Sequence, residues 1–135
     1  MTEPAQLPLV GASPPSVLAT STHDVLRCLT AHRFDSSTEE RLQAGIAQAL
    51  AAEGLQLERE VVLAPGSRID FLSADGIGIE VKIEGTETSV LRQLMRYAEI
   101  DRVRELVLFT TRSKHLAMPA TLRGKPLAVY FQGGL

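Results

Sequence analysis

The sequence predicts an α/β fold in which a helix, three antiparallel strands, a second helix and a further strand follow in order, giving a central mixed sheet flanked by helices. Three observations predict it. Apolar residues at helical spacing, Leu42, Ile46 and Leu50, come first. Three strand-like segments follow, separated by the turn sequences Pro65-Gly66 and Asp75-Gly76. A second helical pattern then precedes a short, compact apolar run at residues 106–110.

The first helix has recognisable boundaries. Ser36 and Ser37 precede an acidic first turn, and Ser37 and Glu40 have the spacing of a capping box. Gly54 ends the helical pattern, since glycine commonly follows the last turn of a helix. Residues 57–63 form the predicted first strand, which ends at Pro65-Gly66.

The second and third strands form a predicted hairpin. Residues 68–73 and 77–83 flank Ala74-Asp75-Gly76, and an Asp-Gly pair accepts the positive φ that tight turns require. Two strands joined in this way run antiparallel. Asp70 and Glu80 are therefore expected at the ends of the two strands that lie far from the turn.

The remaining elements complete the predicted sheet. Residues 85–88 open a second helix, whose apolar face is formed by residues at helical spacing: Leu91, Leu94, Met95 and Ala98. Residues 106–110 and 127–131 are the last two predicted strands.

Three ionisable residues at the open end of the hairpin form the predicted site. Side chains two residues apart share a strand face, so Glu80 and Lys82 project together while Val81 points away. Hard carboxylate oxygens suit Mg²⁺, which lowers the pKa of a bound water, and a lysine can orient that water or stabilise charge on a phosphate. The alternative interpretation is a surface acid followed by a solvated Glu–Lys pair on an edge strand, because short patterns of this kind arise often by chance.

Asp70 and the run Glu80-Val81-Lys82 resemble the signature of the PD-(D/E)XK nuclease superfamily, in which an acid near the end of one strand is followed by (Asp/Glu)-x-Lys on the next. Ile69, and not the family's proline, directly precedes the acid. Downstream, Gln93 and Tyr97 are similar to the Gln-x-x-x-Tyr element of the helicase-associated nuclease branch. Their spacing places them on one face of a helix.

The resemblance covers the chain from about residue 38 to its end and implies a restriction-endonuclease-like core. It also implies hydrolysis of DNA phosphodiester bonds with Mg²⁺ or Mn²⁺. The implied catalytic residues are Glu39, Asp70, Glu80 and Lys82. The implied metal ligands are Asp70, Glu80, Glu39 and the backbone carbonyl of Val81. The implied substrate-binding residues are Gln93, Arg96 and Tyr97; from spacing alone, Gln93 and Tyr97 also fit a polar helix face with a half-buried tyrosine.

Two glutamates could supply the carboxylate that the first helix contributes to the site in many superfamily members. Glu39 shares a helix face with Leu42 and Ile46 and should therefore face the sheet. Glu40 lies closer to Gln43, nearer solvent. Glu39 is the predicted site residue, and the alternative is that both glutamates only complement the positive end of the helix dipole.

The length and composition fit one small domain. A chain of 135 residues can bury a single core. Prolines among small residues predict a flexible arm at residues 1–16. Residues 17–35 are predicted to form a short helical lead-in, and residues 36–135 are predicted to form the nuclease-like domain. No apolar run is long enough to span a bilayer and no signal-peptide pattern is present, so we expect a cytoplasmic protein without membrane contact. Cys28, the one cysteine, suits a reducing compartment and is expected to be packed as a small apolar side chain, and the three histidines are not at metal-ligand spacing.

Charge bears on the expected partners. The formal net charge of −2 argues against tight DNA binding, but Lys and Arg outnumber acids between Arg92 and Lys125. Weak or partner-assisted binding to DNA is therefore expected, with a homodimer or a larger nucleic-acid-processing complex as the assembly. Two alternatives remain: a catalytically inert nuclease fold that binds DNA or protein, and a regulatory protein whose acidic cluster contacts a basic partner.

Overall fold

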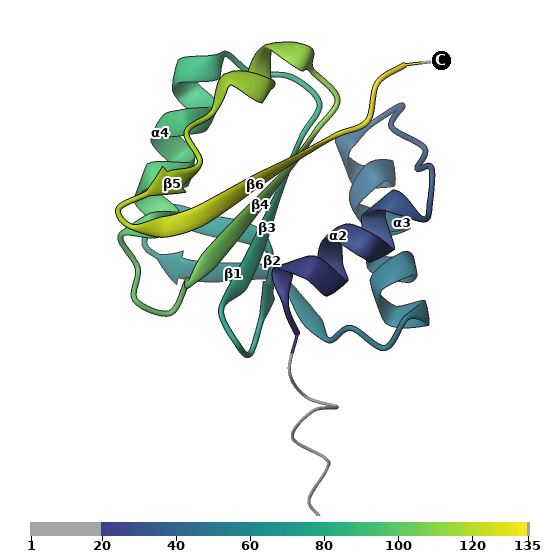
Figure 1. The fold of residues 1–135 in the computed structure, drawn as a ribbon, viewed down its shortest axis with the longest axis horizontal. Coiled ribbons are helices and arrows are strands. Elements are labelled where there is room, and N and C mark those ends of the chain that lie inside the picture. Colours follow the sequence, from purple (N-terminus) through teal and green to yellow (C-terminus); the bar gives the residue numbers. More distant parts are fainter. Residues whose placement is uncertain (1–19, 135) are drawn as a thin grey trace, which may run out of the picture.

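The computed structural model describes residues 20–134, so the predicted arm at residues 1–16 lies outside the described part. Within this range the chain forms an α/β structure with a six-stranded mixed sheet in the strand order β1-β2-β3-β4-β6-β5. Figure 1 shows α2 and α3 on one side of the sheet and α4 on the other. The elements in chain order are α2 (Thr22–Thr30), α3 (Glu39–Ala52), β1 (Leu57–Ala64), β2 (Ser67–Ser73), β3 (Ile77–Lys82), α4 (Glu87–Ala98), β4 (Glu105–Thr110), the 3-10 helix η2 (Ser113–Ala117), β5 (Thr121–Leu122) and β6 (Lys125–Phe131).

The predicted order of elements and the mixed sheet are confirmed. β1, β2 and β3 are antiparallel neighbours, β3, β4 and β6 run parallel, and the short β5 is antiparallel to β6. The sequence patterns did not predict η2 or β5. Among residues 20–134, no helix is both long enough and apolar enough to cross a membrane.

The start of α3 differs from the predicted capping box. Thr38, and not Ser37, is the N-cap, and its hydroxyl accepts a hydrogen bond from the backbone N–H of Arg41 at 3.0 Å. Ser37 is held in the preceding turn, where its N–H donates to Asp35 at 2.9 Å. Because Arg41 stands three residues after the true N-cap, no acidic side chain can close a capping box there.

Within the described residues, apolar side chains form two cores, one on each face of the sheet. The first packs α2 and α3 against the sheet and includes Leu42, Ile46 and Leu50, as their spacing predicted. Val25 of α2 is buried in the same core, so α2, within the predicted lead-in, packs against the predicted domain. The second core packs α4 against the opposite face.

The hairpin between β2 and β3 turns at Gly76, as predicted, and its strands separate at the other end. Gly76 has φ of +92°, and a Cβ at this position would lie 2.8 Å from the carbonyl oxygen of Arg102. Beyond the pair Phe71–Ile79, β3 continues alongside β4 through Lys82, whereas β2 continues alongside β1. The two strands therefore form a fork, which opens where the sequence has its two acids.

Candidate functional site

Asp70 and Glu80 lie directly opposite each other in the fork. The register that pairs Phe71 with Ile79 makes them the next pair outward, at the point where regular pairing ends. The backbone N–H of Val81 donates a hydrogen bond to Oδ2 of Asp70 at 2.8 Å. The Asp70 carboxylate therefore accepts the hydrogen bond that a neighbouring strand would otherwise accept from the Val81 N–H. This contact fixes the carboxylate in the fork.

Glu80 is almost completely buried, with 3 % of its side chain exposed. Its Oε2 lies 3.2 Å from Nζ of Lys82, whose side chain is 21 % exposed, so the predicted pair shares one strand face. Its Oε1 lies 3.1 Å from the hydroxyl oxygen of Tyr97 on α4. Each carboxylate oxygen of Glu80 thus has its own partner, and the lysine side of the pair is open to solvent.

Tyr97 and Gln93 support Glu80 from the helix behind it. The Tyr97 hydroxyl accepts a hydrogen bond from Gln93 Nε2 at 2.8 Å and lies 2.8 Å from the carbonyl oxygen of Arg68. Its single proton can go to that carbonyl or to Glu80, but not to both at once. Tyr97 is completely buried and meets the predicted site only through Glu80, whereas Arg96 is exposed on the same helix.

The two central carboxyl groups hold protons more tightly than ordinary acids. Burial raises the pKa of Asp70 to about 6; the bond from Val81 N–H lowers it less, and the charge of Glu39 adds to the rise. Burial also raises the pKa of Glu80 to about 7, with a further rise from Asp70 and a partial offset from Lys82. When both acids are ionised, the single ammonium group of Lys82 therefore cannot balance their two negative charges.

Glu39 is the helix glutamate that faces this cluster. Its carboxylate is half-buried and close enough to raise the pKa of Asp70, whereas Glu40 is exposed. The expectation that Glu40 and Gln43 share a side nearer solvent is wrong for Gln43. That residue is buried, and its Nε2 lies 3.4 Å from Oε2 of Glu39, one helical turn away.

Two further residues at the fork were not predicted. Glu60 on β1 lies opposite Asp70 in the register, has φ of +55°, and raises the pKa of Asp70. A left-handed backbone at a non-glycine residue is strained. Nothing in the residue sequence signals this conformation, because a glutamate that follows Glu58 and Arg59 is typical of an ordinary solvent-facing part of a strand.

His115, completely buried, clamps the segment that follows Lys82. Its Nε2 lies 2.8 Å from the carbonyl oxygen of Gly85, which can only accept, so Nε2 carries the proton. Its Nδ1 lies 2.6 Å from the Thr110 hydroxyl. The ring thus joins the loop between β3 and α4 to the end of β4.

The donor set of the fork fits a small, hard divalent cation. Asp70, Glu80 and the nearby Glu39 offer carboxylate oxygens, the ligand type that Mg²⁺ and Mn²⁺ prefer. The N–H and C=O of one strand residue point to the same side, so the Val81 carbonyl shares the side on which its N–H meets Asp70. The raised pKa values of both acids are those expected of a site that a cation completes.

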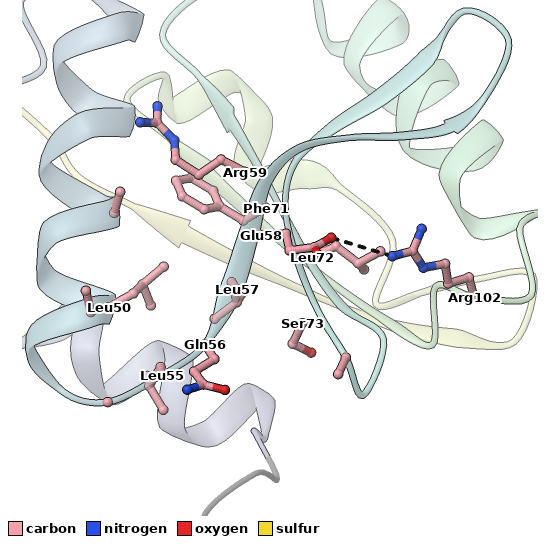
Figure 2. A pocket seen from close by; sticks show the side chains of 14 residues that line it. Leu50, Leu55, Gln56, Leu57, Glu58, Arg59, Phe71, Leu72, Ser73 and Arg102 are labelled. Carbon is pink, nitrogen blue, oxygen red and sulfur yellow. Dashed lines mark ion pairs between the residues drawn. The ribbon is translucent and has the colours of Figure 1, made fainter.

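A large hollow lies elsewhere. It has a volume of about 700 Å³ and is bounded by the end of α3 and the β1–β2 edge near the hairpin turn. Figure 2 shows its apolar lining, with Leu50, Leu55 and Phe71, and the Arg102–Glu58 ion pair at its rim. None of the predicted site residues lines it, and its chemistry does not suggest catalysis.

Comparison of the chain with known protein families, with curated proteins and with solved structures finds no match.

Proposed function

We propose that this protein is a Mg²⁺- or Mn²⁺-dependent deoxyribonuclease with a restriction-endonuclease-like core of the PD-(D/E)XK type. The observation that carries the proposal is the fork between β2 and β3, where Asp70, Glu80 and Lys82 converge as the pairing of the two strands ends. A strained glutamate, a buried tyrosine and a helix glutamate surround the same point, which is more than a solvated surface pair requires.

Each residue has a distinct task in this proposal. Asp70, Glu80, Glu39 and the Val81 carbonyl would hold the cation, which when bound acidifies water and offsets phosphate charge. Lys82 has rotatable donors, and its partly exposed ammonium group can orient the attacking water or a phosphate oxygen. Tyr97 keeps the Glu80 carboxylate in one orientation through its hydroxyl.

The surface beside the fork offers cations for a DNA backbone. Lys82 is the last residue of β3, which runs parallel to β4. Arg112 and Lys114 are exposed and follow directly after β4, so their charge lies at the same edge of the sheet. Arg102 and Arg123 instead form ion pairs with glutamates. The small number of cationic side chains named beside the fork favours weak DNA binding over a tight, extended contact surface.

The experiment that tests the function is incubation of the purified chain with branched, single-stranded and linear DNA, with Mg²⁺, with Mn²⁺ and with a chelator. Isothermal calorimetry measures metal binding in the same preparations. We expect cleavage of at least one DNA form that depends on added metal and disappears in Asp70→Asn. Metal binding without cleavage of any form would favour an inert binding module, and neither binding nor cleavage would favour a regulatory protein with an acidic contact surface.

A further inference from the structure

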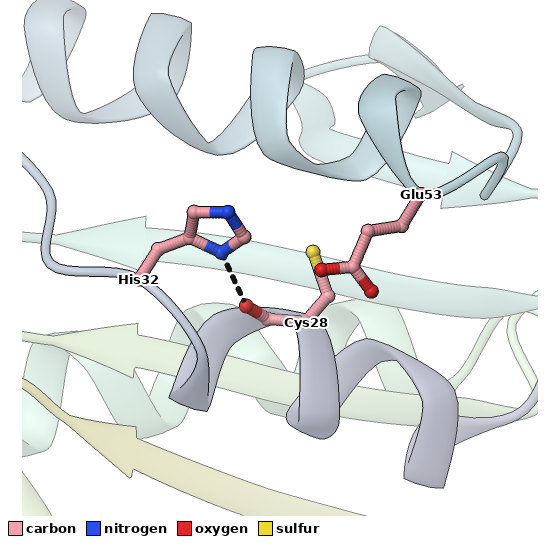
Figure 3. Close-up of side chains that lie close together, drawn as sticks. All are labelled: Cys28, His32 and Glu53. Carbon is pink, nitrogen blue, oxygen red and sulfur yellow. Dashed lines mark hydrogen bonds between the residues drawn. The ribbon is translucent and has the colours of Figure 1, made fainter.

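A second group of ligand-bearing side chains lies away from the fork, where α2 ends beside the end of α3. Cys28, His32 and Glu53 each offer one ligand atom, and these atoms all lie within 4.8 Å of one another. Figure 3 shows the three side chains converging from the last turn of α2, the segment after it and the C-cap of α3. The spacing of the histidines did not predict this group, because Glu53 comes from a distant part of the chain.

A backbone carbonyl holds one nitrogen of the His32 ring. Its Nδ1 lies 2.8 Å from the carbonyl oxygen of Cys28, which can only accept a hydrogen bond. Nδ1 therefore carries the proton and leaves the lone pair on Nε2. A backbone carbonyl that fixes the other ring nitrogen is the usual support of a metal-bound histidine. The ring also stacks on Phe34, with the centroids 5.7 Å apart.

Access to the group is open from the solvent side. Cys28 is buried, but His32 and Glu53 are exposed above it. His32 also lines a hollow of about 350 Å³ between the segment after α2 and the side of α3. A cation arriving from solvent would therefore meet His32 and Glu53 first, with the Cys28 sulfur beneath them.

We propose that Cys28, His32 and Glu53 bind one Zn²⁺ ion, with water as the fourth ligand. Thiolate, imidazole and carboxylate together favour zinc and similar transition metals over Mg²⁺. Zinc bonds of roughly 2.0–2.3 Å place tetrahedral ligand atoms about 3.5 Å apart, so the exposed side chains need to close by about 1 Å. Binding replaces the S–H proton of Cys28 with a Zn–S bond, and that proton leaves to solvent.

The zinc site is separate from the proposed nuclease site and does not rest on it. Helix α3 carries Glu39 in its first turn, near the fork, and Glu53 at its C-cap. At a rise of about 1.5 Å per residue these two glutamates are roughly 20 Å apart. A bound ion would join the ends of α2 and α3, which the described contacts otherwise hold by apolar packing.

Cobalt absorption tests the site directly, with protein that carries no polyhistidine tag and has been stripped of metal. Cys28 is the one cysteine of the chain, so a thiolate-to-cobalt charge-transfer band can come from no other residue. We expect this near-ultraviolet band to saturate at one equivalent of Co²⁺, to vanish when Zn²⁺ displaces cobalt, and to be absent in Cys28→Ser.

Three more variants test the site even if Cys28→Ser folds poorly. His32→Gln and Glu53→Gln change exposed side chains and should weaken Co²⁺ binding tenfold or more. His23→Gln, exposed on α2, should leave the charge-transfer band and its Co²⁺ affinity unchanged. No charge-transfer band at saturating Co²⁺, or affinities of His32→Gln and Glu53→Gln equal to that of His23→Gln, would overturn the proposal whether or not the protein cleaves DNA.

Discussion

At the scale of single residues, the fork is defined by a shortage of positive charge. Asp70 and Glu80 are both buried, and their pKa values are raised chiefly by that burial. Lys82 contacts Glu80 and offsets only part of the cost. A folded protein that keeps such a cluster gives up stability at neutral pH, which is common where residues are arranged for binding and not for packing.

Asp70→Asn should therefore stabilise the metal-free protein at pH 8. The folded-state pKa of Asp70 is raised, so its contribution to stability is fully present at low pH and is lost as the pH rises through about 6. Asparagine has nearly the same shape without the charge, and we expect a gain of roughly 1–3 kcal/mol in the free energy of unfolding at pH 8. Urea denaturation in chelator should show this gain shrinking toward zero near pH 4. Asp101→Asn, at an exposed residue, is the control, and an unchanged pH dependence in Asp70→Asn would contradict the prediction.

Metal binding should follow the opposite pH trend. Protons compete with Mg²⁺ for Asp70 and Glu80, whose pKa values lie near 6 and 7. We expect calorimetry to show tighter Mg²⁺ binding at pH 8 than at pH 6. Asp70→Asn should weaken binding by a large factor at both values, because a ligand is lost. Equal affinity in Asp70→Asn and the parent would remove Asp70 from the site.

Tyr97→Phe should alter the pKa of Glu80 without removing a proposed metal ligand. The change removes the hydroxyl that meets Glu80, Gln93 and the Arg68 carbonyl. Loss of buried hydrogen bonds should cost about 1–3 kcal/mol in the free energy of unfolding. Since the Tyr97 hydroxyl lowers the pKa of Glu80, the pH profile of cleavage should move to higher pH.

Tyr130→Phe, at the other tyrosine of the chain, is the matched control. It packs in the core on the opposite face of the sheet and should leave the pH profile of cleavage in place. A profile that does not move in Tyr97→Phe, with stability reduced, would assign Tyr97 a role in packing alone.

At the scale of elements, local patterns predicted the helices and strands well, because spacing and turn residues act over a few positions. Leu42, Ile46 and Leu50 are buried as predicted, and Gly76 stands at the turn of the hairpin. One helix boundary escaped prediction: Thr38, and not Ser37, is the N-cap of α3, and the N–H of Ser37 instead donates to Asp35 in the preceding turn.

The candidate site was predictable only in part, because local spacing does not report contacts between distant residues. The opposite placement of Asp70 and Glu80 follows from the hairpin, and the Gln93–Tyr97 contact follows from helical spacing. The strained backbone of Glu60 and the clamp formed by His115 depend on neighbours far along the chain. Tertiary contacts of this kind leave no periodic signal in the sequence.

The turn that sets the hairpin register gives a stability prediction. Gly76→Ala forces a side chain into positive φ and brings its Cβ to 2.8 Å from the Arg102 carbonyl. Gly54→Ala meets positive φ as well, but nothing lies within 4 Å of its Cβ. We expect Gly76→Ala to lower the free energy of unfolding by about 1–3 kcal/mol more than Gly54→Ala, the cost of overpacking. Equal losses in urea denaturation would show that the approach of Arg102 is unimportant.

At the scale of the whole molecule, the outer strands of the sheet bear on assembly. β1 forms one edge of the sheet, and Val62 on it is 65 % exposed. One small domain also has little surface with which to hold a duplex, and closed two-fold dimers are the commonest oligomers. We therefore predict a homodimer. Light scattering across a range of protein concentrations checks it, and a mass of one chain throughout would contradict it.

The most direct test of the proposed nuclease is metal-dependent DNA cleavage by Lys82→Ala beside the parent, with folding checked by circular dichroism and Mg²⁺ binding by calorimetry. Lys82 contacts Glu80 but, as an ammonium group, cannot ligate a cation. Mg²⁺ affinity should therefore be unchanged or slightly tighter, while cleavage falls by about two orders of magnitude or more, as when a preorganised donor is removed. Equal cleavage by Lys82→Ala and the parent would contradict the assignment of this site.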